Sequence, residues 1–374
     1  MLISPPFLPD RGHLTEDAWL DAAMPGCEHG LFPVSHRLGW HGGRHLQAPA
    51  DGANMQPVRA IADGTVVHVR QRSDAAALTY AGGYTSDGVV VLRHDTEIGA
   101  NAQNQPTTVR FYSVYMHLHS IDAAVRQGRS LYRKDSIGQA GHIQGQPNCC
   151  QIDICLDDEN LRRLVGRLDG EVPLDRDGRT DALYGDAYVY LPPGTPLYAQ
   201  DPGALVQPPA TVPIMARSTE PWVVGLHHER GAITVTTYDM GGRLLGSLPA
   251  EADAEYGLYQ RALAHSGAVQ QARVAGGQRD AAAPAPSACH ELLRWARVLG
   301  PDAMQGDVPH WRRIATPVGT GWVNLNATGT TKFSDADFPQ WRGWTLMDDA
   351  QDGDSRCDSP TIRRMLDANG DGRI

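Results

Sequence analysis

The sequence predicts a mainly β protein with more than one domain. The chain has 374 residues, and domains usually hold about 100–200 residues, so two or three domains are expected. In the first 200 residues, several short segments alternate between apolar and polar residues, as half-buried strands do. The alternation returns after residues 201–213, where proline and glycine predict a linker.

Several segments of the first 200 residues predict regular structure. Residues 57–70 alternate around Asp63-Gly64, which predicts a β-hairpin. The others are strands at 87–94, 108–118 and 149–156, rich in β-forming residues or alternating, a short helix at 157–167, and a strand–turn–strand at 187–200.

The second half predicts strands and short helices. Strands are expected at 221–247 and 310–325, helices at 252–268 and 289–299, and a flexible stretch at 269–288. Gly319–Leu325 resembles the GxGWV stretch of bacterial SH3-like domains, which often bind cell-wall peptides. The predicted organisation is a first domain at 1–200, an SH3-like β region with helices at 214–345, and a C-terminal segment at 346–374.

Composition excludes several classes of function. The formal net charge is -10, from 33 basic and 43 acidic residues, which disfavours nucleic-acid binding. No apolar run is long enough to span a membrane, and the N-terminus lacks the basic and apolar regions of a secretory signal. The six cysteines form neither a disulfide framework nor a CxxC pair, so a reduced chain made in the cytoplasm is expected.

Histidines are the chemical signal of the first domain, which has ten of the fifteen before residue 150. His41 and His45 follow Trp40 and flank two glycines. Gly42-Gly43 disfavours a helix and predicts a turn or strand edge where the backbone approaches a bound ion. Neutral imidazole is a standard zinc ligand, so this segment is a candidate metal site.

Two predicted strands carry further candidates. Alternate residues of a strand face the same side, so His117 and His119, which follow Tyr115, are expected to project together as a metal or catalytic pair. One face of the strand at 149–155 carries thiol, amide and carboxylate groups, from Cys149, Gln151, Asp153 and Cys155.

Taken in order, these segments resemble the lysostaphin-type zinc metallopeptidases of peptidoglycan, over about residues 30–200. His41–His45 stands where that family has HxGxD, and Val58–Val69 where it has a hairpin with an Asp-Gly turn. Tyr115–Leu118 follows the family's YxHL, and Val125–Gly128 with Ile137–Gly141 follows its next two glycine segments. The resemblance implies an antiparallel β fold, a zinc cofactor and peptidoglycan as the substrate.

The family's ligand and catalytic positions are altered in this chain. The resemblance implies His41, His45 and Asp153 as zinc ligands, with His45 in place of the family's aspartate. Cys149 is the rival third ligand, and Gln151 a poorer one. The resemblance also implies His117 as a catalytic histidine, with His119 or His142 for the second, and Trp40 and Tyr115 as substrate-binding neighbours.

The C-terminus carries a calcium signature. Asp367, Asn369 and Asp371, with Gly372 at position 6 and Ile374 at position 8, match the first eight positions of an EF-hand loop. The glutamate of position 12 would lie beyond Ile374. We therefore expect weak Ca²⁺ binding in this chain and a calcium cofactor in a longer protein.

The layout resembles type VI secretion effectors that degrade peptidoglycan, of the amidase–lysozyme type. This implies an antibacterial toxin that is made in the cytoplasm without a signal peptide and delivered by the secretion machinery to the target periplasm. It also implies an immunity protein. The expected activity is hydrolysis of an amide bond of the wall peptide, with N-acetylmuramoyl-L-alanine amidase favoured over metalloendopeptidase.

Two alternatives remain open. One is a catalytically degenerate module that binds peptidoglycan within a larger lytic effector. The other is a thiol-dependent hydrolase that uses Cys149 or Cys150 with His117.

Overall fold

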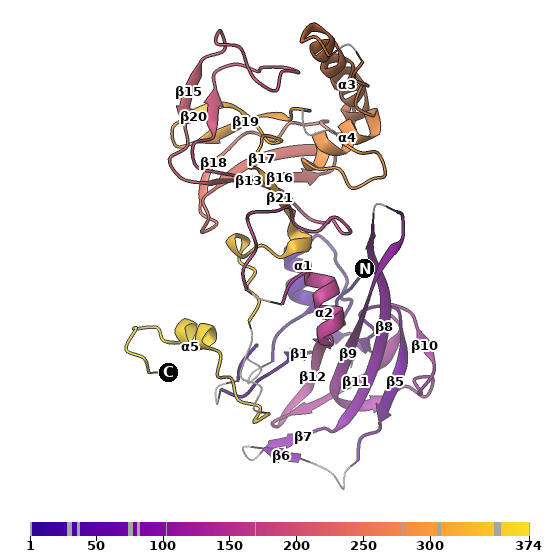
Figure 1. The fold of residues 1–374 in the computed structure, drawn as a ribbon. Helices are drawn as coiled ribbons and strands as arrows, with labels where there is room; N and C mark the ends of the chain where they lie inside the picture. The colour runs from indigo at the N-terminus through magenta and orange to yellow at the C-terminus, as the bar shows by residue number, and fades with distance from the viewer. Residues whose placement is uncertain are drawn as a thin grey trace. The chain divides into compact units, whose positions relative to one another are not determined.

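The computed structural model describes residues 2–27, 32–35, 38–73, 78–80, 83–101, 103–168, 170–278, 280–304, 308–347 and 353–373. The protein is mainly β, as predicted (Figure 1). It divides into a first unit of residues 1–97, 108–161 and 347–374 and a second unit of residues 98–107 and 162–346. The predicted ranges differ from this division, because residues 162–200 lie in the second unit and residues 347–374 lie with the first.

The first unit is built on an eight-stranded sheet in the order β1-β12-β11-β9-β8-β5-β10, with β4 paired to β11. The pairings with known register are antiparallel. The strands are β1 (Gly43–Gln47), β4 (Val58–Arg59), β5 (Gly64–Arg70), β8 (Gly88–Ala100), β9 (Pro106–Ile121), β10 (Ser130–Leu131), β11 (Ser136–Ile143) and β12 (Gln146–Cys155). Two small ribbons accompany it, β2 (Ala50–Asp51) with β3 (Asn54–Met55), and β6 (Leu78–Tyr80) with β7 (Gly83–Thr85).

The predicted hairpin at 57–70 is wrong in its pairing. Both strands form, but β4 pairs with β11, whereas β5 pairs with β8 and β10. A Cβ on Gly64 would lie 2.6 Å from His94 Nδ1, so the Asp63-Gly64 turn needs glycine to pack against β8. Alternation identifies strands, but it does not identify their partners.

One face of this sheet carries the core of the first unit. Alternate residues of β8 and β9 enter this core. Among them are Leu92, Phe111 and Tyr115, whose exposed surface is at most 1%. Each such side chain contributes about 1.5–3 kcal/mol to stability by leaving water. The helix α1 (Glu16–Ala23) begins where Thr15 Oγ1 accepts a hydrogen bond from Ala18 N, at 3.3 Å. The predicted helix at 157–167 is α2 (Asp158–Val165).

The second unit has two further sheets. One has the order β18-β17-β16-β13-β21 and the other β15-β14-β20-β19. Both contribute to one core, which includes Val224 from the first sheet and Leu197 and Val323 from the second. The strands are β13 (Ala187–Leu191), β14 (Pro196–Tyr198), β15 (Ile214–Arg217), β16 (Trp222–Glu229), β17 (Ala232–Tyr238), β18 (Leu244–Ser247), β19 (Trp311–Thr316), β20 (Gly319–Asn324) and β21 (Thr331–Ser334).

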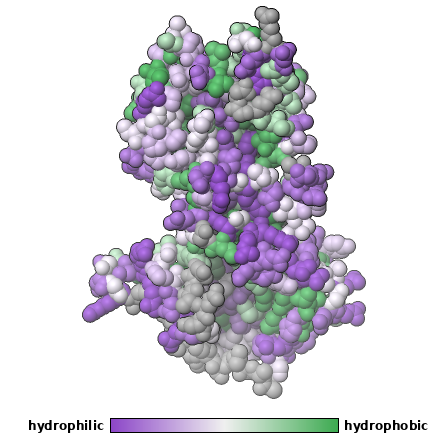
Figure 2. All heavy atoms as spheres, in the orientation of Figure 1, coloured by the Kyte–Doolittle hydropathy of each residue, from purple (hydrophilic) through white to green (hydrophobic). Residues whose placement is uncertain are grey.

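Helices flank these sheets. The helix α3 (Leu258–Ala275) packs on α4 (Pro286–Trp295) through Val269 and Leu292. Two 3₁₀ turns follow β21, at Asp335–Asp337 and Gln340–Arg342. Residues 269–275 are helical, so the flexible stretch predicted at 269–288 begins later than expected. No helix of the described residues has the length and apolar character needed to cross a membrane. Figure 2 shows hydrophobic residues in small groups among hydrophilic ones on the face in view.

Candidate functional site

Two histidines meet where β1 begins. The side-chain Nε2 atoms of His41 and His45 lie 3.1 Å apart, and the rings are nearly perpendicular, at 83°. His45 is buried, with 6% of its surface exposed. The two Nε2 atoms are therefore within hydrogen-bond distance of each other beside the strand, and their role as zinc ligands stays a prediction.

The register of the sheet decides which residue joins them. In the antiparallel pair β1–β12, His45 lies opposite Gln151, whereas Asp153 lies opposite Gly43. Gln151 Oε1 is 3.1 Å from His45 Nε2, and Gln151 Nε2 donates to Asp153 Oδ1 at 2.9 Å. The amide of Gln151 is thus next to the histidines, and the predicted ligand Asp153 contacts that amide. Across the described ranges, no three His, Cys, Asp or Glu side chains are grouped so that they would hold a metal ion.

The glycines between the histidines have a structural reason. A Cβ on Gly43 would lie 1.7 Å from Asp153 Oδ1 and 2.2 Å from the Ile152 carbonyl oxygen. On Gly42 the nearest atom would be Asp153 Oδ2, at 3.2 Å. The sequence suggests that these glycines let the backbone approach a bound ion. In the structure, Gly43 makes room for the Asp153 carboxylate.

The strand β9 changes its partner strand at His117, which is not part of the core. Up to Met116 this strand pairs with β12, and from Leu118 onward it pairs with β11. His117 lies at the change of partner and has a φ of +64°. Tyr115 and Leu118 are both buried, so the two residues between them break the simple alternation of core positions. Simple alternation would have placed His117 on the core side with Tyr115.

One hydrogen bond fixes the tautomer of the neutral His117 ring. Its Nδ1 lies 2.9 Å from the Ser86 carbonyl oxygen, which only accepts, so Nδ1 carries the proton and Nε2 the lone pair. The ring centroid is 6.1 Å from that of His45. Ser86 is completely buried, and its Oγ accepts from the backbone N of His142 at 3.1 Å. Ser86 therefore anchors both His117 and β11.

A polar pocket of about 460 Å³ lies in the same unit. His119 is exposed and lines it together with His142, whose Nδ1 is buried without a hydrogen-bond partner among the described residues. The remaining lining residues include three side-chain amides, and they are Asn54, Met55, Gln139, Ala140 and Asn148. Both histidines considered for the second catalytic position thus face one pocket.

The predicted substrate role of Tyr115 is wrong. Tyr115 has no exposed surface, and its hydroxyl accepts from the backbone N of Ile61 at 2.9 Å. Burial raises the pKa of this phenol to about 12. Its place in the alternation of β9 puts it in the core. Trp40 differs, because 39% of its surface is exposed beside His41.

The C-terminal segment holds the loop that carries Trp40 and His41. The backbone N of Trp40 donates to the Ser355 carbonyl oxygen at 2.9 Å, and Cys357 N donates to Leu38 O at 2.6 Å. Val34, Cys357 and Ile362 form a small core there, with Ile362 supplied by α5 (Pro360–Leu366). No sequence pattern predicted this contact between segments about 320 residues apart.

The predicted calcium loop follows α5 directly. Asp367 accepts through Oδ1 from Asp371 N at 3.1 Å and through Oδ2 from Gly372 N at 2.8 Å. Gly370 and Gly372 have φ values of +71° and +76°. Asn369 Nδ2 donates to Asp371 Oδ2, so these oxygens bond within the loop. Calcium binding stays a prediction, and Ile374 lies outside the described residues.

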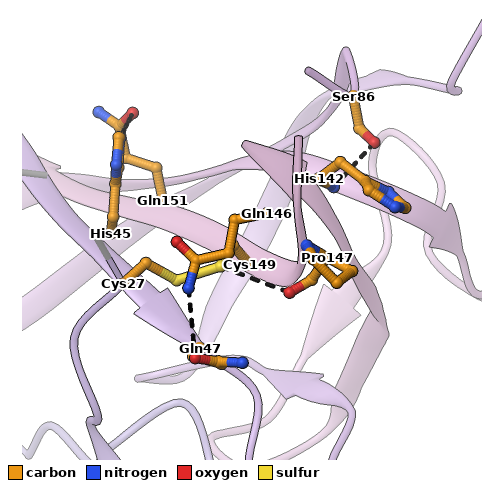
Figure 3. Close-up of a disulfide and its surroundings, with 9 residues drawn as sticks. All are labelled: Cys27, His45, Gln47, Ser86, His142, Gln146, Pro147, Cys149 and Gln151. Carbon is orange, nitrogen blue, oxygen red and sulfur yellow. Dashed lines mark hydrogen bonds between the residues drawn. A yellow bond between two sulfur atoms is a disulfide. The ribbon is translucent and has the colours of Figure 1, made fainter. Parts of the chain in front are cut away.

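A disulfide corrects the prediction of a reduced chain. Cys27 and Cys149 are bonded, 122 residues apart in the sequence. Figure 3 shows this bond beside His45 and Gln151. Cys27 N also donates to the His45 carbonyl oxygen at 3.1 Å, so the bond ties the N-terminal segment across β1 to β12. Spacing alone did not reveal it, because the two cysteines meet only through sheet pairing.

The disulfide also removes two predicted roles of Cys149, as third zinc ligand and as nucleophile. Cys150 is the other thiol proposed, and it points into the core, where burial raises its pKa to about 12. A thiol at that pKa is protonated at neutral pH and is a poor nucleophile. The thiol-dependent hydrolase is therefore wrong for both residues.

Comparison with known proteins adds little. No protein-family model and no curated protein matches the chain. One solved structure that matches is the NMR solution structure of lysostaphin, at 15% identity and a TM-score of 0.22, covering 56% of this chain and 81% of that one. A likeness this weak assigns neither a family nor an activity, so function must be argued from the residues themselves.

Proposed function

We propose that the first unit is a zinc-dependent peptidoglycan hydrolase that cleaves an amide bond of the wall peptide. N-acetylmuramoyl-L-alanine amidase is favoured over metalloendopeptidase. The observation that carries this proposal is the convergence of His41 and His45, whose Nε2 atoms are 3.1 Å apart, with His117 nearby.

The two histidines fit zinc. With Zn–N bonds of about 2.0–2.1 Å, two tetrahedral ligands lie about 3.3 Å apart, close to the observed separation of 3.1 Å. The third protein ligand would be an oxygen, either the amide oxygen of Gln151 or a carboxylate oxygen of Asp153. When bound, zinc supplies a Lewis acid that polarises the scissile carbonyl and makes a water more acidic.

The other residues provide proton transfer and binding. The hydrogen bond from His117 Nδ1 to Ser86 leaves Nε2 able to accept a proton from the attacking water. Asn54, Gln139 and Asn148 line the pocket and offer both donors and acceptors, which suit the amides of a peptide. Trp40 offers an exposed apolar surface next to His41.

We further propose that the protein acts as an antibacterial effector in the periplasm of a target cell. It would be made in the cytoplasm, exported by a type VI machinery and neutralised in the producer by an immunity protein. The Cys27–Cys149 bond supports a periplasmic site of action, because disulfides persist in oxidising compartments such as the periplasm.

The test combines metal content with digestion of purified peptidoglycan. About one zinc per chain is expected, with soluble products lost on chelation and regained with zinc. His41→Ala and His45→Ala should abolish zinc binding and digestion, whereas His68→Ala, at an exposed position on β5, should change neither. Mass spectrometry of the products separates an amidase from an endopeptidase. No zinc and no soluble product would refute the proposal.

The degenerate binding module is the second candidate, and the position of Gln151 favours it. An amide oxygen is a weak zinc ligand, and Asp153 is engaged by that same amide. This candidate predicts that the protein sediments with peptidoglycan without releasing products, and that it binds less than one zinc per chain.

A further inference from the structure

The second unit buries two cations beside one pocket. Arg297 and Lys332 are 5% and 8% exposed, and both line a cavity of about 280 Å³. Arg297 follows α4 closely, and Lys332 lies on β21, so two regular elements fix their positions. The chain has only two lysines, Lys134 and Lys332, and one of them is placed here.

Neither cation forms a direct ion pair among the described residues, although the charge of Asp177 acts on both of them. Arg297 Nη2 donates to the Gly178 carbonyl oxygen at 3.2 Å, and its Nη1 is buried with no hydrogen-bond partner among the described residues. Lys332 Nζ donates to Thr330 Oγ1 at 2.9 Å. Burying unpaired charges is unfavourable, and burial lowers the pKa of both groups.

Two carboxylates line the same pocket. Asp177 Oδ1 accepts from the backbone N of Lys332 at 2.9 Å, which holds it at the wall. Asp302 accepts a hydrogen bond from Ser287 Oγ. The pocket therefore presents two positive and two negative side chains, and it lies within the second unit alone.

Such a lining is complementary to a ligand that carries both charges on a small frame. Pockets for small molecules usually measure about 300–1,000 Å³, and this one, at about 280 Å³, lies just below that range and suits a small ligand. An α-amino acid with a free ammonium and a free carboxylate has both the size and the charges. A simple anion would be repelled by Asp177 and Asp302. A simple cation would be repelled by Arg297 and Lys332.

We propose that this pocket binds the zwitterionic end of an α-amino acid. The carboxylate lies toward Arg297 and Lys332, and the ammonium lies toward Asp177 and Asp302. The group could come from two sources, a free amino acid or an unlinked amino-acid centre on a wall peptide, such as that of diaminopimelate. The inference goes beyond the proposed hydrolysis and does not depend on zinc.

Calorimetric titration of the intact chain tests this. The probes are meso-diaminopimelate, its N-acetylated and amidated forms, lysine, and soluble muropeptides that contain diaminopimelate. Binding is expected for the probes with a free zwitterion and should be lost when either charge is blocked. Muropeptides that bind more tightly than the free amino acid would identify the wall peptide as the source, and the reverse order would identify the free amino acid.

Variants locate the binding. Lys332→Met and Asp302→Asn should each weaken it at least tenfold. The matched control is Lys134→Met, which removes the charge of the other lysine and should change nothing. Lys332 Nζ makes one hydrogen bond, to Thr330, and no direct ion pair among the described residues, so Lys332→Met removes a buried charge without breaking a pair and should fold, as thermal melting would show.

A further variant separates this inference from the hydrolase. His45→Ala, which should abolish zinc binding in the first unit, should still bind the zwitterion. No binding by any zwitterion, or undiminished binding in Lys332→Met and Asp302→Asn, would overturn the inference.

Discussion

Gln151 faces His45 across the β1–β12 pair, with Oε1 3.1 Å from Nε2. Its other amide atom donates to Asp153, so the carboxylate fixes which atom of the amide points toward the histidines. The candidate zinc site therefore has two imidazoles and an amide at its centre, with the carboxylate one hydrogen bond away. In the proposed function, this relationship sets how tightly the site would hold zinc.

Replacing the amide should strengthen the metal site. Gln151→His should raise zinc affinity at least tenfold, because an imidazole nitrogen binds zinc better than an amide oxygen does. Competition with a chromophoric chelator measures this. Gln146→His, on the same strand, should leave affinity unchanged. Equal zinc affinity in wild type and Gln151→His would show that residue 151 is not at the metal.

Gly43 should be essential in a way that Gly42 is not. The Cβ of Gly43→Ala would overlap Asp153 and the backbone of Ile152, so the β1–β12 pairing must shift and zinc binding should fall. Gly42→Ala meets only a 3.2 Å contact and should have a smaller effect. Zinc content and thermal melting of the two variants provide the comparison. A similar loss in both would contradict the packing described for Asp153.

His117 should matter for turnover and not for metal binding. His117→Asn is expected to lower kcat by about 10²–10⁴ through loss of proton transfer, with zinc content unchanged. Ser86→Ala keeps the carbonyl that accepts from Nδ1, so it should retain most of the activity. Digestion kinetics with zinc analysis measure both variants, and loss of zinc in His117→Asn would assign it a ligand role instead.

The disulfide should contribute strongly to the stability of the first unit. Cys27→Ser and Cys149→Ser should each lower the free energy of unfolding by about 2–5 kcal/mol, because the bond restricts the unfolded chain. The free energy of unfolding of the double variant should be no lower than that of either single variant. Denaturant unfolding with and without reductant measures this, and Cys155→Ser, an exposed free thiol, is the control. A wild-type protein insensitive to reductant would argue against the bond.

Acid should destabilise the second unit through His310. This ring is completely buried and accepts from Arg312 Nε at 3.2 Å, and burial lowers its pKa well below the usual value. Below about pH 6.5 the unfolded chain binds a proton that the folded ring does not. Stability therefore falls as the pH drops, by up to about 1.4 kcal/mol per pH unit.

Unfolding curves at pH 7.5, 6.5 and 5.5 test this dependence. His310→Asn should reduce the slope, whereas His68→Ala should not. The slope that remains would come from His228 and His265, whose pKa values burial also lowers. An identical slope in wild type and His310→Asn would exclude His310 as its source.

The fold class and most of the strands follow from the amino-acid sequence alone. Alternation and turn residues depend on local physics, and the strands at 87–94, 108–118 and 149–156 appear where that pattern places them. The spacing of His41 and His45 across two glycines also marks a candidate metal site, and zinc binding there stays a prediction.

The neighbours of His41 and His45 depend on contacts between distant parts of the chain. Strand register placed Gln151 opposite His45, a positive φ at His117 broke the alternation of β9, and sheet pairing joined Cys27 to Cys149. Burial removed Tyr115 and Cys150 from the chemistry, and it gathered Arg297 and Lys332 around one pocket. These contacts join residues far apart in the chain, where the energy of packing the entire sheet, and not any local preference, selects the partner.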